Sequence, residues 1–190
     1  MNVLFINAAY RDGSRTIRLA EYYLNRFHGD DRVERVELGT NPPQPLDARR
    51  LRIYNESVGA HDFSHEMFDS AKQFVRADVI LIAAPFWNFG LPAVLNAYLE
   101  LVCSQGVSFD IDGQGNYHSL CRAKKLVFVT TAGGLIPEPN CAFGFIRQLC
   151  GAFWGIEDVR CYGAEGLDIA GADTEALLEQ TCRRMECDAI

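Results

Sequence analysis

The chain has 190 residues, of which 48% are hydrophobic and 23% are charged, and this composition is typical of a globular protein. Its net charge of −7 and its pI near 5.1 argue against a nucleic-acid-binding domain, because such domains usually carry a basic patch. No apolar run reaches the roughly 18 residues that a membrane span requires, and residues 1–6 lack the basic region and the cleavage site of a signal peptide.

The first predicted elements are a strand, a helix and a second strand. Residues 2–7 form a continuous apolar strand. A helix with one apolar face follows, and Ser14 is its predicted N-cap. Residues 33–38 alternate between apolar and polar side chains, which predicts a strand at the edge of a sheet.

The next part of the chain leads to a buried strand. Residues 39–59 contain three prolines and predict a loop with a short helix over residues 47–56, while residues 61–77 have the apolar spacing of a helix. Residues 79–84 form an unbroken apolar run, which is typical of a central parallel strand covered on both faces. Pro85 cannot donate to a sheet ladder and therefore ends this strand.

The second half of the chain continues the alternation. Pro92 suits the first turn of a helix that extends to residue 102. Residues 106–122 form a long connection, and connections of this length inside a domain are usually functional. The remaining predicted elements are a strand at 125–131, a helix at 142–153, a strand at 158–162 and a closing helix at 174–187.

Five strands that alternate with helices predict an α/β fold with a doubly wound parallel sheet. The compact strand order is 2-1-3-4-5, the flavodoxin-like arrangement, with helices on both faces. We expect one such domain over residues 1–190. In this arrangement the ligand lies at the carboxyl ends of the strands, where the first and third strands meet, so the loops after the first, third and fourth strands should converge there.

The loop after the first strand suits an anion. It leads into a helix start, where free backbone N–H groups and the positive end of the helix dipole favour negative charge. The candidate residues are Arg11, Ser14, Arg15 and Thr16, which add hydroxyl and guanidinium donors. A monophosphate fits this loop, whereas a Walker motif and a G-x-G-x-x-G motif are absent from the sequence. Ordinary capping by Ser14 is the structural alternative.

The loops after the third and fourth strands suit a flat aromatic ligand with polar edges. One carries aromatic rings and an amide, and the other is a glycine-ended turn that can present consecutive N–H groups. The candidate residues are Pro85, Phe86, Trp87, Asn88 and Phe89 in the first of these loops and Thr131, Ala132, Gly133 and Gly134 in the second. Together the three loops predict a site for flavin mononucleotide (FMN). A turn that merely buries its aromatic side chains is the alternative.

Residues 85–95 resemble a known family signature. They read Pro-Phe-Trp-Asn-Phe-Gly-Leu-Pro-Ala-Val-Leu, which resembles the P-x-[YW]-N-F-x-x-P-x-x-L signature of the NAD(P)H:quinone oxidoreductase and FMN-dependent azoreductase family. Residues 14–16, 131–134 and 164–166 resemble the other landmarks of this family, in the same order. The resemblance covers essentially the whole chain.

The resemblance implies an FMN-dependent oxidoreductase. Reduced nicotinamide, as NADH or NADPH, would pass a hydride to flavin N5 and leave, and a quinone, an azo compound or a similar electrophile would then take two electrons by ping-pong turnover. Ser14 and Thr16 would hold the phosphate, and residues 86–89 would line the flavin. Residues 131–134 would face its pyrimidine end, where N–H groups stabilise negative charge. FAD is less favoured, because no adenine pocket is evident.

The sequence also departs from the family pattern. Ala8 and Ala9 replace a serine that many azoreductases have early in the first loop, and Ala132 stands where an arginine is common. Residues 42–59 do not align with the family and are candidates for part of the substrate pocket. These differences leave the physiological acceptor open, as well as the choice between NADH and NADPH.

Hydride transfer needs positioning more than it needs an acid or a base. Asn88, Tyr117 and His118 are the candidate catalytic side chains. His61 and His65 are spaced as a possible metal pair, but no third ligand accompanies them and no metal is predicted.

Two apolar helices and the cysteine spacing bear on the oligomeric state and on the cellular compartment. The helices at 92–102 and 142–153 are more apolar than one sheet-facing side requires, which favours a homodimer, as the resemblance implies. The seven cysteines lack C-x-x-C and zinc-type spacing, which favours a reducing, cytoplasmic compartment and leaves the redox role of any cysteine open. Two alternatives remain: a flavodoxin-type one-electron carrier, and a flavin-free module on the same fold.

Overall fold

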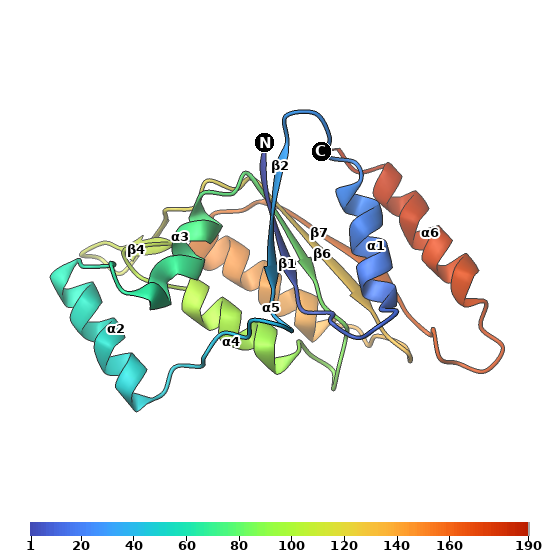
Figure 1. The fold of residues 1–190 in the computed structure, drawn as a ribbon, viewed down its shortest axis with the longest axis horizontal. Coiled ribbons are helices and arrows are strands. Elements are labelled where there is room, and N and C mark those ends of the chain that lie inside the picture. The colour runs from blue at the N-terminus through green and yellow to red at the C-terminus, as the bar shows by residue number, and fades with distance from the viewer. Residues whose placement is uncertain (190) are drawn as a thin grey trace.

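A five-stranded parallel sheet forms the centre of the structure, which is a computed structural model that describes residues 1–189 (Figure 1). The strand order is β2-β1-β3-β6-β7, so the predicted flavodoxin-like order is confirmed. The strands are β1 (Asn2–Asn7), β2 (Arg32–Glu37), β3 (Val79–Ala83), β6 (Lys125–Thr131) and β7 (Asp158–Ala164).

The central strands are apolar because both faces of the sheet are covered. Every residue of β3 and β6 is buried, whereas β2 at one edge has no buried residue. Helices α1 (Arg15–Leu24) and α6 (Thr174–Glu186) cover one face, and α3 (Asp69–Val75), α4 (Ala93–Val102) and α5 (Cys141–Leu149) cover the other (Figure 1). Each face has its own cluster of buried apolar side chains. Parallel strands of this kind place all their carboxyl ends at one edge, which positions the connecting loops together.

Helix α2 (Ala48–Ala60) stands away from the sheet at one end of the structure (Figure 1). It has no buried residue, and Asp47 caps it by accepting a hydrogen bond from the N–H of Arg50. The expected short helix at 47–56 is therefore longer than predicted. It ends at His61, which has a left-handed φ of 51°.

The helix expected over residues 61–77 is shorter than predicted. Polar side chains bind the backbone at its start: Asp62 accepts from the N–H of Ser64, and Nδ1 of His65 accepts from the N–H of Met67. These bonds favour a turn over a helix. A 3₁₀ turn (Glu66–Phe68) and then α3 follow. His61 and His65 thus have local structural roles.

The expected long connection over residues 106–122 contains a small antiparallel hairpin. Its strands are β4 (Phe109–Ile111) and β5 (Tyr117–Ser119). Each strand has three residues, too few to produce a recognisable alternation. Elsewhere, α5 ends in a π-helical turn (Cys150–Trp154), and β7 extends two residues beyond the predicted end.

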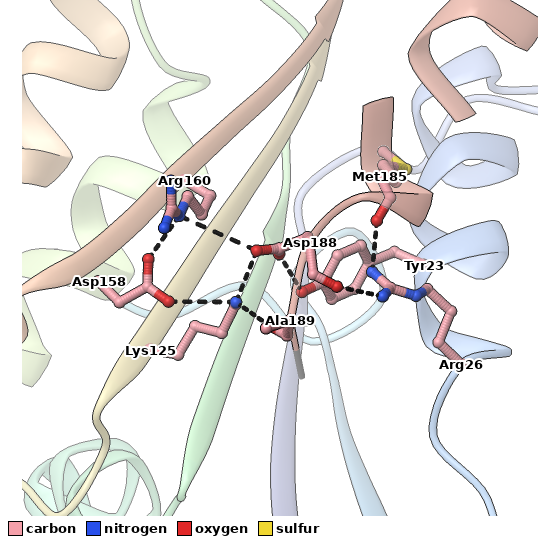
Figure 2. A network of polar contacts seen from close by, with 8 residues as sticks. All are labelled: Tyr23, Arg26, Lys125, Asp158, Arg160, Met185, Asp188 and Ala189. Carbon is pink, nitrogen blue, oxygen red and sulfur yellow. Dashed lines mark hydrogen bonds and ion pairs between the residues drawn. The ribbon is translucent and has the colours of Figure 1, made fainter. Parts of the chain in front are cut away.

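The amino ends of β6 and β7 are tied to the carboxyl-terminal residues by a polar network (Figure 2). Nζ of Lys125 lies 2.8 Å from Oδ1 of Asp188 and 3.1 Å from Oδ2 of Asp158, and the hydroxyl of Tyr23 donates to Oδ2 of Asp188 at 2.7 Å. Burial alone would raise the pKa of Asp188, but the hydrogen bonds from Lys125 and Tyr23 hold that pKa below its ordinary value. The network therefore fixes the carboxyl-terminal end of the chain against the sheet.

All seven cysteines are free thiols. Within residues 1–189, no helix combines the length and the apolar character that crossing a membrane would require.

Candidate functional site

A cavity of about 170 Å³ lies at the carboxyl edge of the sheet, between the loops that follow β1, β3, β6 and β7. This is the point where the chain connections leave β1 and β3 in opposite directions, the usual ligand position in such sheets. The residues that line it are Ala9, Tyr10, Arg11, Ser14, Arg15, Thr16, Pro85, Phe86, Trp87, Thr131, Gly133 and Asp168. The cavity therefore brings together predicted residues from all three predicted loops. Asn88, Phe89, Ala132 and Gly134 do not line it. All but Phe89 are next to a lining residue in the chain, and the ring of Phe89 packs edge-on against that of Phe86 with ring centroids 6.3 Å apart.

The loop after β1 forms a helix start with free donors. The side chain of Ser14 caps α1 by accepting a hydrogen bond from the N–H of Ile17 at 3.3 Å, which confirms the predicted N-cap. Gly13 has a φ of 66°, which turns the chain into this cap. The first-turn N–H groups of Arg15 and Thr16 have no partner inside the helix. The capping hydroxyl of Ser14 can still donate, so this end of the cavity suits an anion.

Thr16 lines the cavity and also makes a contact that the sequence did not predict. It is buried, and its hydroxyl lies 2.6 Å from the hydroxyl of Thr131, which is also buried. This bond joins the first turn of α1 to the last residue of β6. Thr16 also offers the backbone N–H of the first helical turn to an anion.

The loop after β3 is a tight two-residue turn. The N–H of Gly90 donates to the carbonyl of Trp87 at 2.9 Å, and the N–H of Trp87 donates back at 3.3 Å. Asn88 and Phe89 between them have φ values of 51° and 62°, as a type I′ turn requires. For Phe89 this left-handed conformation costs about 1–2 kcal/mol. A Cβ on Gly90 would meet open space, so the unusual backbone lies at Asn88 and Phe89 rather than at the glycine.

Aromatic side chains from two loops stand at the rim of the cavity. Trp87 is 43% exposed and Phe89 is 72% exposed. Tyr10, half exposed, packs edge-on against Trp87 with ring centroids 6.3 Å apart. Gly39 makes room for Tyr10, because a Cβ there would lie 2.3 Å from the Cβ of Tyr10. Sequence reasoning missed Tyr10, although its position in the loop after the first strand was a usable signal.

The loop after β6 offers fewer N–H groups than predicted. The N–H of Ala132 donates to the carbonyl of Ala164 at 2.9 Å, so it is not available to a ligand. The backbone carbonyls of this loop accept hydrogen bonds from N–H groups of the loop after β7. For example, the N–H of Gly166 donates to the carbonyl of Gly134 at 2.8 Å. Gly133 lines the cavity and is the member of this loop best placed to donate.

Arg15 and Asp168 form an ion pair in the wall of the cavity. Nη2 of Arg15 lies 2.9 Å from Oδ1 of Asp168, and Nη1 donates to the carbonyl of Leu167 at 3.2 Å. Sequence reasoning missed Asp168. It follows the fifth strand at the same edge of the sheet as the other loops, and this placement was the signal that could have found it.

Two comparisons of sequence identify the family. A family model described as a flavodoxin-like fold matches residues 1–187. The FMN-dependent NADH:quinone oxidoreductase 2 of Clostridium acetobutylicum is 30% identical over 192 residues, which cover 96% of this chain and 94% of that protein. A second FMN-dependent NADH:quinone oxidoreductase, from Coprothermobacter proteolyticus, is 27% identical, and the match covers 97% of this chain and 96% of that protein.

The chain belongs to this oxidoreductase family.

Solved structures agree with the fold. An azoreductase from Bacillus anthracis str. Sterne superposes with a TM-score of 0.82 at 21% identity, and the match covers 97% of this chain and 96% of the azoreductase. An FMN-dependent NADH-azoreductase from Bacillus anthracis str. Ames Ancestor, solved in complex with FMN, has a TM-score of 0.82 at 19% identity and covers 97% of this chain and 95% of its own. The predicted family, fold and enzyme class, an oxidoreductase, are confirmed.

Tyr117 and His118 lie apart from the cavity in this oxidoreductase chain. Both belong to β5 of the hairpin. Nε2 of His118 lies 3.0 Å from Oδ2 of Asp112, and the ring of Tyr117 packs edge-on against Phe153 at 4.9 Å. The hydrogen bond from His118 lowers the pKa of Asp112. Neither candidate lines the cavity, so within one chain the structure does not bring them to the other site residues.

Part of the unaligned 42–59 region lines a different hollow. Pro45, Leu46 and Tyr54 meet α4 and α5 around an open groove of about 640 Å³. The exposed ring of Phe145 on α5 also lines this groove. It is a mostly apolar surface, separate from the cavity at the carboxyl edge.

Proposed function

We propose that this chain is an FMN-dependent NADH oxidoreductase that reduces quinones, azo compounds or similar electrophiles. The observation that carries the proposal is the meeting of four loops around one cavity where β1 and β3 diverge. Family membership supports FMN as the cofactor and favours NADH over NADPH, because the names of the relatives include FMN and NADH. A single FMN-binding domain over the whole chain and a cytoplasmic location belong to the same proposal.

The residues at the anion end fit the phosphate of FMN. The hydroxyl of Ser14 and the first-turn N–H groups of Arg15 and Thr16 would hold it, and the positive end of the α1 dipole would favour its charge. Arg11 lines the same end and adds a positive charge. These groups bind the phosphate in both oxidation states of the cofactor, so their role is to anchor it.

The rim of the cavity fits an aromatic ring system. A cavity of about 170 Å³ is smaller than the roughly 300–1,000 Å³ of typical cofactor sites, so the ring system would lie at the open rim against Trp87 and Phe89. Bound FMN supplies the two-electron chemistry, in which NADH is oxidised in one half-reaction and the acceptor is reduced in the other. The aromatic side chains orient the reactants and exclude water on their side, and the N–H of Gly133 stabilises negative charge at the polar edge of the ring.

An open rim favours ping-pong turnover. The exposed faces of Trp87 and Phe89 leave one side of the site accessible, which NADH and the acceptor would occupy in turn. No side chain of the cavity needs to carry a proton in the first half-reaction, because a hydride brings both electrons. Asn88, on the strained turn, is the nearest of the three candidate catalytic residues to this rim.

We also propose that the chain forms a homodimer through the groove between α4, α5 and residues 45–54. Its apolar lining and the exposed ring of Phe145 are typical of an interface. Light scattering of the purified protein tests this proposal. A monomer across the accessible concentration range contradicts it.

The test of the proposed function begins with the visible spectrum of the protein mixed with FMN. We expect a bound flavin, anaerobic bleaching by NADH, and steady oxidation of NADH when a quinone is added. Parallel lines in double-reciprocal plots at several quinone concentrations would support ping-pong turnover. Protein that binds no FMN contradicts the proposal, and FMN binding without turnover of NADH favours the one-electron carrier instead.

A further inference from the structure

The cavity contains a carboxylate beside the proposed phosphate site. Asp168 lines the cavity together with Ser14 and Arg15, and its side chain is 66% exposed. A carboxylate that faces the same cavity as a phosphate repels it and lowers the affinity of the site. The structure nevertheless holds Asp168 firmly in this position.

Three features fix Asp168. Its N–H donates to the carbonyl of Gly133 at 2.9 Å, which places the residue against the loop after β6. Its Oδ1 accepts from Nη2 of Arg15 at 2.9 Å. Its Oδ2 occupies the space beside Gly133, where a Cβ would lie only 2.2 Å from that oxygen. Glycine at position 133 therefore makes room for the carboxylate, and no larger residue fits there without moving Asp168.

The ion pair with Arg15 also decides what Arg15 can do. The guanidinium is bound on two sides, by Asp168 and by the carbonyl of Leu167 at 3.2 Å. Its charge is balanced by the carboxylate, so the pair as a whole is neutral. Without the carboxylate, one uncompensated positive charge would face the same cavity as the first-turn N–H groups of α1.

A second ion pair also joins α1 to the part of the chain that follows β7. Arg18, one turn further along α1, binds both carboxylate oxygens of Glu175 on α6, at 2.8 and 2.7 Å. This pair links the same two regions of the chain as Arg15 and Asp168 do. Neither Arg18 nor Glu175 lines the cavity.

We propose that Asp168 is a positioning residue that neutralises Arg15 and thereby limits the affinity of the site for the phosphate of FMN. This inference rests on the proposed function, because it concerns the same cavity. Ser14 and backbone N–H groups would then anchor the phosphate, while Asp168 keeps the guanidinium of Arg15 from binding it. The weaker binding would let FMN dissociate and rebind more readily. Removing the carboxylate while keeping its shape should release Arg15 toward the phosphate.

The test compares FMN with riboflavin, which has the same ring system and ribityl chain but no phosphate. The dissociation constants of both are measured by flavin fluorescence for the wild type, Asp168→Asn and Glu175→Gln. In Asp168→Asn we expect FMN to bind about tenfold more tightly, with the gain shrinking as salt is added, and riboflavin to gain clearly less, because it lacks the phosphate that the released Arg15 would bind. Glu175→Gln removes the matched charge outside the cavity, and both dissociation constants should stay as in the wild type.

Asp168→Ala and a thermal melt of each variant guard against a loss of folding. The inference is supported if either folded Asp168 variant raises the preference for FMN over riboflavin. It is overturned, with the proposed function intact, if the wild type binds FMN but the FMN-to-riboflavin ratio of the folded variants is unchanged or lower. Wild-type protein that binds neither flavin overturns both.

Discussion

The hydroxyl oxygens of Thr16 and Thr131 lie 2.6 Å apart and join the first turn of α1 to the end of β6. Both side chains are buried. The pair holds the anion end of the cavity against the loop after β6. It is also a contact between residues 115 positions apart in the chain.

Breaking this pair on one side should destabilise the protein. We expect Thr131→Val to lower the free energy of unfolding by about 1–3 kcal/mol, because the hydroxyl of Thr16 is left buried without a partner. The double variant Thr16→Val/Thr131→Val should lose less than the sum of the two single variants. Urea unfolding of all four proteins measures this. Strictly additive losses would show that the two hydroxyls do not interact.

The left-handed conformation of Phe89 predicts a difference between two small replacements. Phe89→Gly and Phe89→Ala both remove a ring that is 72% exposed, but only glycine adopts a φ of 62° without cost. We expect Phe89→Gly to be more stable than Phe89→Ala by about 1 kcal/mol. Thermal or urea unfolding checks the order, and an alanine variant as stable as the glycine variant would mean that the turn relaxes.

Trp87 should contribute to flavin affinity through its exposed ring. We expect Trp87→Ala to raise the dissociation constant of FMN about fivefold, because an aromatic contact is lost at the rim. His118→Ala is the control, since His118 lies in the hairpin and does not line the cavity. Equal effects of the two substitutions on fluorescence titrations with FMN would contradict the proposed ring site.

Asp188 should make stability depend on acid pH. Its pKa is lower in the folded protein than in the unfolded chain, so its contribution is complete above the unfolded value, about 4, and is lost as the pH falls through the folded value. We expect Asp188→Asn to cost about 3 kcal/mol at neutral pH, because the buried ammonium of Lys125 loses a partner. The gap from the wild type should close below pH ~4.

Urea unfolding at several pH values checks this expectation. Glu179→Gln is the matched control: it removes an exposed partner of Arg183 on α6 and should change stability by less than about 1 kcal/mol. A constant difference between Asp188→Asn and the wild type down to low pH would show that the carboxylate of Asp188 is not the titrating group.

The cysteines should differ sharply in reactivity. Burial raises the pKa of Cys103, Cys121, Cys150 and Cys161 to about 12, so these thiols are protonated and unreactive at neutral pH. Cys141 and Cys187 are exposed. We expect an alkylating reagent to label these two first in the native protein and all seven in denaturant, as read by mass spectrometry of peptides. Early labelling of Cys150 would show that α5 opens locally.

The helix cap at Ser14 was predictable from a local pattern, and the strand order followed from the alternation of strands and helices along the chain. The apolar run at 79–84 is typical of a strand covered on both faces, and a serine before an amphipathic segment is a common helix start. The three converging loops followed from the strand order. The resemblance of residues 85–95 to the family signature then predicted FMN as the ligand of these loops.

The contacts that shape the cavity were not predictable, because they join residues far apart in the chain. Thr16 meets Thr131, and Arg15 meets Asp168 across 153 positions. No local pattern indicates that the N–H of Ala132 donates to the carbonyl of Ala164. The hairpin at 109–119 was missed for another reason: each of its strands is too short to show a period.

The polar network around Lys125 (Figure 2) lies at the amino edge of the sheet. The cavity lies at the carboxyl edge. The contacts that hold the last described residues and the cavity therefore lie at opposite edges of the same sheet. Proteins with this fold can therefore change residues at the rim of the cavity, and with them the electrophiles that they accept, without disturbing the network around Lys125. An engineered variant can likewise carry substitutions at the rim, provided that the contacts of Asp188 with Lys125 and Tyr23 are kept.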